Sequence, residues 1–328
     1  MVDYMAKRAF LFPGQGAQFV GMGQDIYQAF RAARDIFDRS EAVTALPIKK
    51  LCFEGPKEQL DRTDIAQPAI FTVSAAMLGV MNEMVPPEVR IKPDVCAGLS
   101  LGEYTALYAA GAMDFETALK LVARRGELMQ QAAVARPSGM LAVIGLDEQQ
   151  ARRLCEAASE GQVLTCANFN CPGQIVLSGE KDACQRAAAM AEQFGAKAVT
   201  PLKVAGAFHS EIMAPAGKEF AKTLPNVHFS RLNCPVIANV DATEYSAAGD
   251  IPKKLLGQLT GAIRWEQSMR VLLGDGVEMF YEIGPGKVLG GLMRRINRKV
   301  RVTPVNSTEA VERLTATELE EKCQQAKE

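Results

Sequence analysis

Histidine is scarce in this chain, and its cysteines are not spaced for metal binding. The 328 residues include only two histidines, and no two of the eight cysteines stand in a Cys-x-x-Cys spacing. Zinc sites draw their ligands from closely spaced cysteines and histidines, so we expect no metal site. We interpret the cysteines as free buried thiols in a reducing compartment. They are Cys52, Cys96, Cys155, Cys166, Cys171, Cys184, Cys234 and Cys323.

Long hydrophobic runs and an excess of either charge are also missing. No stretch reaches the roughly 18 consecutive apolar residues of a membrane-spanning helix, and residues 1–8 contain no apolar signal region. The formal net charge of −1 indicates no general attraction to nucleic acid or to a membrane surface. We therefore expect no nucleic-acid or membrane partner. The expected location is cytoplasmic, or an organelle stroma or matrix if a transit peptide has been removed.

Short apolar runs alternate with glycine turns and helical patterns. Ala9–Phe12 leads into Pro13-Gly14-Gln15-Gly16, and Asp94–Ala97 leads into Gly98–Gly102, which predicts two buried strands that end in turns. Helices are predicted over Gly23–Ser40, Ile65–Met84, Gly102–Ala110 and Phe115–Ala133. This alternation favours an α/β fold with a mostly parallel sheet.

Residues 133–203 show a different order, βαββαβ, which is typical of a ferredoxin-like subdomain. The predicted strands are Met140–Gly145, Val163–Phe169, Ile175–Ser178 and Lys197–Val204. The predicted helices are Asp147–Ser159 and Asp182–Phe194. Because this unit lies inside the chain, we expect a discontinuous large domain made of residues 1–132 and 204–328. From Thr308 the pattern predicts a polar surface helix or a frayed tail.

The second predicted strand leads into Gly98-Leu99-Ser100-Leu101-Gly102, a G-x-S-x-G pattern. Between a buried strand and a helix, this pattern is typical of a nucleophilic serine on a tight turn. The glycines leave room for crowded backbone, and the N–H of Leu101 at the helix N-terminus faces the substrate oxygen. The alternative is that Ser100 only caps the helix.

A serine nucleophile needs a base, and the chain offers two histidines. His228 alternates with Val227 and Phe229, which predicts the polar face of a strand and a surface or structural role. His209 follows the apolar run Val204–Phe208 and precedes a helical pattern, which places it at a sheet edge. A structural role is open for His209 as well, but beside the serine turn it is the candidate base. No acidic residue stands out as a third member, and a backbone carbonyl can orient an imidazole instead.

Periodicity separates two adjacent arginines of the predicted helix Phe115–Ala133. Arg125 shares a face with apolar residues, namely Ala118, Val122 and Met129. Arg124 shares a face with polar residues, namely Lys120, Glu127 and Gln131. We therefore expect Arg125 to point inward, where its charge needs a partner. That partner is either a carboxylate of the protein, in an internal salt bridge, or a carboxylate of the substrate.

Together these residues resemble the malonyl-CoA:acyl carrier protein transacylase family, over roughly residues 8–305. The matching segments are Phe12–Gln18, Gly98–Tyr104, Arg125-Gly126, Asn168–Gln174, Phe208–Ser210, Gln258-Leu259, Trp265 and Glu282–Lys287. Several separate motifs in one order are far more specific than the serine pentapeptide alone. One position departs from the commonest family pattern: Leu99 stands before the serine, where the family often has histidine.

The resemblance implies an α/β-hydrolase-like large domain with a ferredoxin-like insert. It implies that malonate acylates Ser100, that His209 is the base and that the backbone carbonyl of Gln258 supports it. The oxyanion hole would be formed by the N–H groups of Gln15 and Leu101.

Substrate and partner follow from the same resemblance. Arg125 would hold the malonyl carboxylate, and Phe208 resembles the phenylalanine of relatives that prefer malonyl over methylmalonyl. The expected partners are malonyl-CoA and an acidic acyl carrier protein, in type II fatty acid synthesis. The densest basic cluster is a candidate docking patch, although such clusters are usually only solvated: Arg294, Arg295, Arg298, Lys299 and Arg301.

No bound cofactor is expected. Gly14-Gln15-Gly16 lacks the third glycine of a dinucleotide loop, because Phe19 stands in its place. Three other functions remain open: a serine thioesterase or esterase, a non-catalytic module that binds a partner, and a discrete transferase of a polyketide pathway. An inward Arg125 argues against a simple esterase.

Overall fold

Two β-sheets organise the chain in this computed structural model, which describes residues 6–325. The larger sheet has five parallel strands in the order β7-β2-β1-β8-β9, and the smaller has four antiparallel strands in the order β4-β5-β3-β6. The strands of the larger sheet are β1 (Lys7–Phe12), β2 (Val95–Gly98), β7 (Val236–Ile237), β8 (Val277–Ile283) and β9 (Val302–Val305). Those of the smaller sheet are β3 (Ser138–Ile144), β4 (Leu164–Cys171), β5 (Gln174–Glu180) and β6 (Ala198–Pro201). The fold is mixed α/β, as the alternation predicts.

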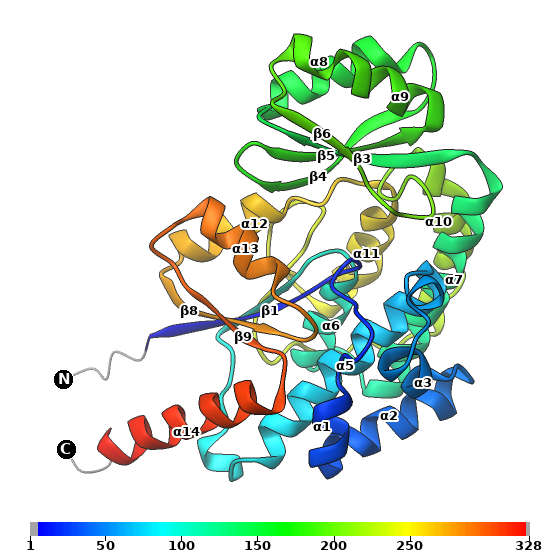
Figure 1. Cartoon of the computed structure of the whole chain (residues 1–328). Coiled ribbons are helices and arrows are strands. Elements are labelled where there is room, and N and C mark those ends of the chain that lie inside the picture. The colour runs from blue at the N-terminus through cyan, green and yellow to red at the C-terminus, as the bar shows by residue number, and fades with distance from the viewer. Residues whose placement is uncertain (1–5, 326–328) are drawn as a thin grey trace.

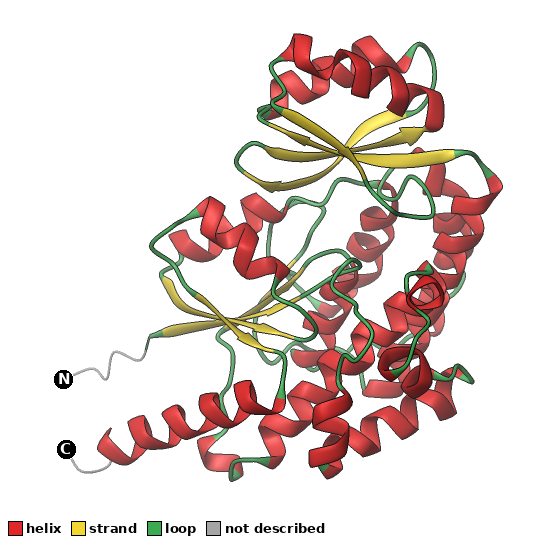
Figure 2. Cartoon of the chain, in the orientation of Figure 1, coloured by secondary structure: helices red, strands yellow, loops and turns green. Residues whose placement is uncertain are grey.

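Helices cover both faces of the larger sheet (Figures 1 and 2). Phe10 and Phe12 of β1 belong to one apolar core, and Ala9 and Leu11 belong to another. Successive side chains of a strand point to opposite faces, so β1 contributes to both cores. The first core is built with α1 (Gln24–Ala29), α2 (Arg31–Thr44), α3 (Ile48–Phe53), α4 (Lys57–Leu60), α5 (Thr63–Glu83), α6 (Leu101–Ala109), α7 (Phe115–Ala135), α10 (Ala214–Ala221), α11 (Ile251–Thr260) and α14 (Thr308–Gln325). The second is built with α12 (Trp265–Gly274) and α13 (Val288–Ile296).

One described helix, α5, is long and apolar enough to cross a membrane by length and composition. Within its most apolar 18-residue window, 83% of the residues are buried inside the protein. It packs against α2 and α7 in the first core. Its apolar character therefore reflects its place in the interior.

The smaller sheet is formed by consecutive segments in the predicted βαββαβ order. Its helices are α8 (Glu148–Ser159) and α9 (Lys181–Met190), which lie together on one face of the sheet (Figure 2). The last strand ends at Pro201 and does not continue to Val204 as predicted. The strands before and after this unit, β2 and β7, lie side by side in the larger sheet.

Two further predictions need correction. The pattern over Gly23–Ser40 forms two helices, because Phe30 between them is extended and packs its ring on the core. Val227–Ser230 is not a strand: Ser230 N–H donates to the carbonyl of Ala112, and no neighbouring strand pairs with the segment in the described chain. Its alternation reflects one side of an extended loop that packs on the core, and His228 on the other side is exposed.

Candidate functional site

Ser100 lies on the tight turn between β2 and α6, in a backbone conformation that few non-glycine residues adopt. Its φ is 52° and its ψ is −102°. A Cβ on Gly98 would lie 1.9 Å from the carbonyl carbon of Gly102, and a Cβ on Gly102 would lie 2.0 Å from the carbonyl oxygen of Phe12. Both positions therefore require glycine, and the turn holds Ser100 at the carboxyl end of the sheet.

The Ser100 side chain contacts His209 and Arg125. Its Oγ lies 2.8 Å from Nε2 of His209 and accepts a hydrogen bond from Arg125 at 3.1 Å. The hydroxyl makes no capping hydrogen bond to α6, so the capping alternative is wrong. The arrangement joins a serine oxygen to an imidazole nitrogen at hydrogen-bond distance, as nucleophilic catalysis requires.

His209 is oriented by a backbone carbonyl. Its Nδ1 lies 2.7 Å from the carbonyl oxygen of Gln258, an atom that can only accept. Nδ1 therefore carries the ring proton, and Nε2 presents a lone pair to the Ser100 hydroxyl. No acid is needed to fix this tautomer.

The surroundings of His209 keep its ring uncharged. The residue is 4% exposed. Burial and the nearby Arg125 charge lower its pKa to about 3, against the opposing effect of the Gln258 carbonyl. A neutral imidazole at neutral pH is the form that can take a proton from serine.

Arg125 points inward and Arg124 outward, as periodicity predicts. Arg125 is 1% exposed, whereas Arg124 is partly exposed and pairs with Glu127 at 2.6 Å. The Arg125 guanidinium donates to the side-chain oxygens of Gln67 (2.7 Å) and Gln258 (2.8 Å), and burial lowers its pKa.

No carboxylate within residues 6–325 forms an ion pair with Arg125, so the internal salt-bridge alternative is wrong. Its Nε is buried without a hydrogen-bond partner in the same part of the chain. The guanidinium therefore retains both charge and hydrogen-bonding capacity for a ligand carboxylate.

Besides Gln67, the buried acceptor for Arg125, two buried polar residues of the site were missed by the sequence reasoning. Asn239 accepts a hydrogen bond from the N–H of Ser100 (2.6 Å) and donates to the carbonyl of Gly98 (2.7 Å), so it clamps the turn from both sides. It stands two residues after β7, and a polar residue just beyond a buried strand was the available signal. Glu103 on α6 is 0% exposed, and burial raises its pKa to about 7 against three hydrogen bonds and the attraction of Arg125.

The predicted oxyanion donors lie around the same turn. The N–H of Leu101 begins α6, and the segment that leads to Gln15 is tied to the turn because Leu99 N–H donates to the Phe12 carbonyl at 3.0 Å. In the described chain neither the N–H of Gln15 nor that of Leu101 has an acceptor. Phe208, beside His209, is buried, and its carbonyl accepts from Ser178 of the smaller sheet at 2.6 Å.

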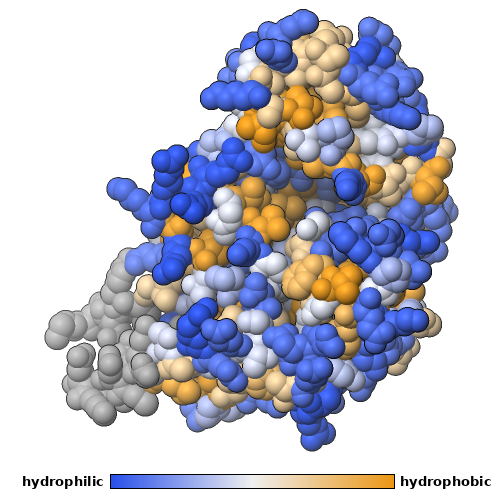
Figure 3. Space-filling view, in the orientation of Figure 1, coloured by the Kyte–Doolittle hydropathy of each residue, from blue (hydrophilic) through white to orange (hydrophobic). Residues whose placement is uncertain are grey.

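The basic cluster lies on α13 and the loop after it. Arg294, Arg295 and Arg298 are exposed and, with Pro172, line a cavity of about 680 Å³. Arg295 donates to the side-chain oxygen of Gln174 at 2.7 Å, so it is tied to the smaller sheet. Figure 3 shows hydrophilic side chains gathered at the left edge of the molecule, where the loop after α13 lies in Figure 1.

Comparison with known proteins gives matches over most of the chain. The family described as acyl transferase domain matches residues 9–272. The malonyl CoA-acyl carrier protein transacylase of Bacillus subtilis is 42% identical over 94% of this chain and 96% of its own length. A polyketide biosynthesis malonyl CoA-acyl carrier protein transacylase of Bacillus velezensis is 41% identical over 90% of this chain and 98% of its own. The crystal structure of an acyl carrier protein S-malonyltransferase from Vibrio cholerae superposes with a TM-score of 0.89, at 38% identity, over 94% of this chain and all of that one.

Proposed function

Because the chain belongs to the malonyl CoA-acyl carrier protein transacylase family, we propose that it transfers malonyl from malonyl-CoA to the phosphopantetheine thiol of an acyl carrier protein. The reaction supplies type II fatty acid synthesis. One observation carries the proposal: a serine–histidine pair stands beside a buried arginine that has no carboxylate partner in the described chain. That arrangement combines acyl transfer with recognition of an acid.

The first half of the reaction acylates Ser100. Nε2 of His209 takes the hydroxyl proton as Oγ attacks the thioester carbonyl. The tetrahedral oxyanion forms beside the N–H groups of Gln15 and Leu101, each of which contributes about 2.7–4 kcal/mol to its stabilisation. The C–S bond then breaks, the thiolate of coenzyme A takes the proton from His209, and a malonyl ester of Ser100 remains.

The second half reverses the roles of the two thiols. His209 removes the proton from the phosphopantetheine thiol, whose sulfur attacks the malonyl ester. When the ester bond breaks, His209 returns the proton to Oγ, and malonyl leaves on the carrier protein. The two substrates use the same site in turn, which is a ping-pong order.

Arg125 selects the malonyl group by pairing with its free carboxylate. With acetyl in its place, the buried guanidinium would lack its charge partner, at a cost on the order of 3–5 kcal/mol. This corresponds to roughly a hundredfold to a few thousandfold selectivity. The bulky Phe208 beside His209 favours malonyl over the branched methylmalonyl group.

We class the larger unit as an α/β-hydrolase-like catalytic domain, made of residues 1–132 and 204–328. Residues 133–203 form a ferredoxin-like subdomain, in keeping with their βαββαβ order. The chemistry is complete with side chains and backbone N–H groups, so the enzyme uses no cofactor besides its substrate. We place the enzyme in the cytoplasm, where a reducing environment suits its buried thiols.

A basic patch is the docking surface for the acidic carrier protein. We define it as Arg294, Arg295, Arg298 and Lys299, which lie exposed on α13 and the loop after it. Opposite charges steer the encounter and orient the partner. The surface pocket that the three arginines line can receive an acidic side chain of the partner.

A polyketide pathway is the second candidate for the reaction's destination. The relative from Bacillus velezensis with that name is nearly as similar as the one from Bacillus subtilis. The chemistry at Ser100 would be the same, and the carrier protein served would differ. A thioesterase is less consistent with the site, because a buried Arg125 favours one acid substrate.

Intact-mass measurement with malonyl-CoA, acetyl-CoA and methylmalonyl-CoA side by side tests the proposal. The wild-type protein should gain one malonyl group and release one equivalent of coenzyme A, with further release only after carrier protein is added. Ser100→Ala should gain nothing, whereas the control Ser159→Ala, at a half-buried serine of the smaller unit, should behave as the wild type. A malonyl adduct on Ser100→Ala, or continuous release of coenzyme A without carrier protein, would overturn the assignment.

A further inference from the structure

The side chain of Gln258 connects the groups that the proposed reaction uses. Its Oε1 accepts from Arg125 at 2.8 Å, and its Nε2 donates to the carbonyl of Ser100 at 2.9 Å. Its backbone carbonyl meanwhile holds the ring of His209. The orientation of the amide therefore decides whether Arg125 faces a hydrogen-bond acceptor or a donor.

Glu103 fixes the orientation of that amide together with the Ser100 carbonyl. Its Oε2 accepts a hydrogen bond from Nε2 of Gln258. Both Glu103 oxygens act as acceptors here and a guanidinium can only donate, whereas an amide has one accepting and one donating end. Only one orientation of the Gln258 amide gives both Glu103 and Arg125 a partner. A flipped amide would place its NH₂ against the N–H groups of Arg125 and its oxygen against the carboxyl oxygen of Glu103.

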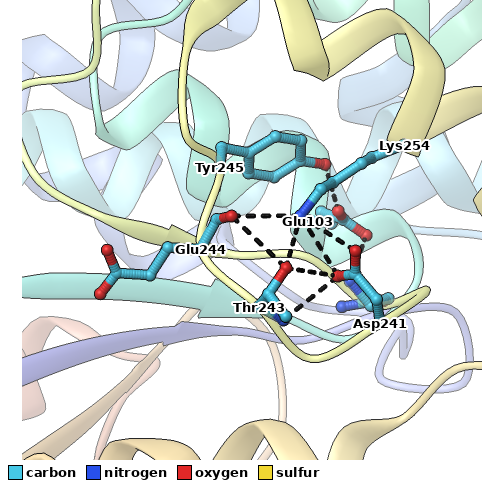
Figure 4. Close-up of polar contacts among 7 residues, drawn as sticks. Glu103, Asp241, Thr243, Glu244, Tyr245 and Lys254 are labelled. Atoms are coloured by element: carbon cyan, nitrogen blue, oxygen red, sulfur yellow. Dashed lines mark hydrogen bonds and ion pairs between the residues drawn. The ribbon is translucent and has the colours of Figure 1, made fainter.

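Glu103 is itself held by two further donors, of which Figure 4 shows Tyr245. The Tyr245 hydroxyl donates to Oε1, and the N–H of Asn239 donates to Oε2 at 3.2 Å. Lys254 lies 5.2 Å from the centre of the Tyr245 ring and pairs with Asp241 at 3.1 Å. The carboxylate is thus fixed at both oxygens before any substrate arrives.

The Gln258 amide also separates two charges that would otherwise pair. Glu103 attracts Arg125, but the hydrogen bond that Arg125 makes on this side goes to a neutral oxygen. A direct ion pair would occupy the guanidinium and compete with a substrate carboxylate. The spacer keeps Arg125 oriented and still available.

We propose that Glu103 is a positioning residue for malonyl selection, which acts by fixing the Gln258 amide that holds Arg125 toward the substrate carboxylate. This inference rests on the proposed function. Loss of Glu103 should therefore slow the transfer of malonyl, which carries a carboxylate, and largely spare the transfer of acetyl, which carries none.

The test compares the kcat/KM values for acylation of Ser100 by malonyl-CoA and by acetyl-CoA. Glu103→Leu removes the acceptor, and the malonyl-to-acetyl ratio should fall on the order of tenfold to a hundredfold, the range for a hydrogen bond that involves a charged group. Glu103→Gln should keep the ratio within about threefold, because its oxygen can accept from Gln258 while its NH₂ donates to Tyr245. Gln258→Met, which retains the backbone carbonyl, should lower the ratio at least as much as Glu103→Leu.

The double variant Glu103→Leu/Gln258→Met separates this route from any other. If Glu103 acts through the amide, the double variant has the ratio of Gln258→Met alone. The inference would be overturned if the two substitutions lowered the malonyl-to-acetyl ratio additively, or if kcat/KM fell equally for malonyl-CoA and acetyl-CoA. It would also be overturned if Glu103→Gln lowered the ratio as much as Glu103→Leu. Should Glu103→Leu fail to fold, Tyr245→Phe, which loosens Glu103 without touching Gln258, must lower the ratio about threefold, and an unchanged ratio would overturn it. Absence of malonyl on wild-type Ser100 would instead refute the proposed function.

Discussion

Ser100 and His209 both adopt positive φ angles, 52° and 58°, that side chains other than glycine rarely tolerate. Such backbone costs on the order of 1–3 kcal/mol and persists only where neighbours hold it. Asn239 holds the first residue through the Ser100 N–H, and the Gln258 carbonyl holds the second through Nδ1. The two reacting atoms are therefore placed by distant residues and not by their own local sequence.

Because the chain has only two histidines, the charge state of His209 can be read directly. In a His228→Gln variant, its imidazole gives the only histidine side-chain signals in an NMR spectrum. A pKa lowered to about 3 means that the ring loses its proton well below the ordinary 6.5, so it should stay neutral from pH 8 down to pH 5. A titration midpoint near pH 6.5 would contradict the burial and the effect of Arg125 that the structure shows.

Among the elements, those with a marked apolar run or period before residue 204 were predicted, whereas strands β7, β8 and β9 were not. The strand before Ser100 was recognised as a short apolar run that leads into a glycine turn, and the inward side of Arg125 followed from the periodicity of helix α7. β7 spans only two residues, too few to show a period, so the position of Asn239 after it was not foreseen. Glu103 escaped notice because its partners come from segments more than 130 residues away, which only the topology brings together.

The turn between β2 and α6 should not tolerate a methyl group at Gly102. The Cβ of Gly102→Ala would lie 2.0 Å from the Phe12 carbonyl oxygen, so the turn and the loop that leads to Gln15 must move apart. We expect a loss of about 1–3 kcal/mol in the free energy of unfolding, the usual cost of overpacking. Coenzyme A release should slow by about a hundredfold or more, because a misplaced oxyanion donor is lost as well. Urea unfolding and the burst of coenzyme A measure the two effects.

Gly274→Ala is the matched control, since nothing lies within 4 Å of a Cβ there. It should retain the wild-type burst and a nearly unchanged unfolding midpoint. If Gly102→Ala acylated at the wild-type rate, the close approach of the two segments would have no part in positioning the oxyanion donors.

At the scale of the whole molecule, both sheets contribute to the surroundings of the site. The larger sheet carries the serine turn, while Ser178 of the smaller sheet holds the carbonyl of Phe208 beside the base. Arg295 on α13 is likewise tied to Gln174 at the start of β5. The two units thus meet at the reacting groups and again at the basic patch. A near-neutral protein can direct an acidic partner only by such a local concentration of positive charge.

Reversing charge on the basic patch should therefore affect one half-reaction and spare the other. Arg294→Glu/Arg298→Glu changes the net charge from −1 to −5, since each exchange subtracts two. The KM for acyl carrier protein should rise about tenfold at low salt, and less at high salt because screening weakens both attraction and repulsion. Malonyl-CoA should still acylate Ser100 at the wild-type rate.

The control Arg153→Glu/Lys181→Glu carries the same net charge on exposed residues of the smaller unit and should leave the KM for carrier protein nearly unchanged. Equal increases in both variants would assign the effect to overall charge, and no increase in the first would place docking on another surface.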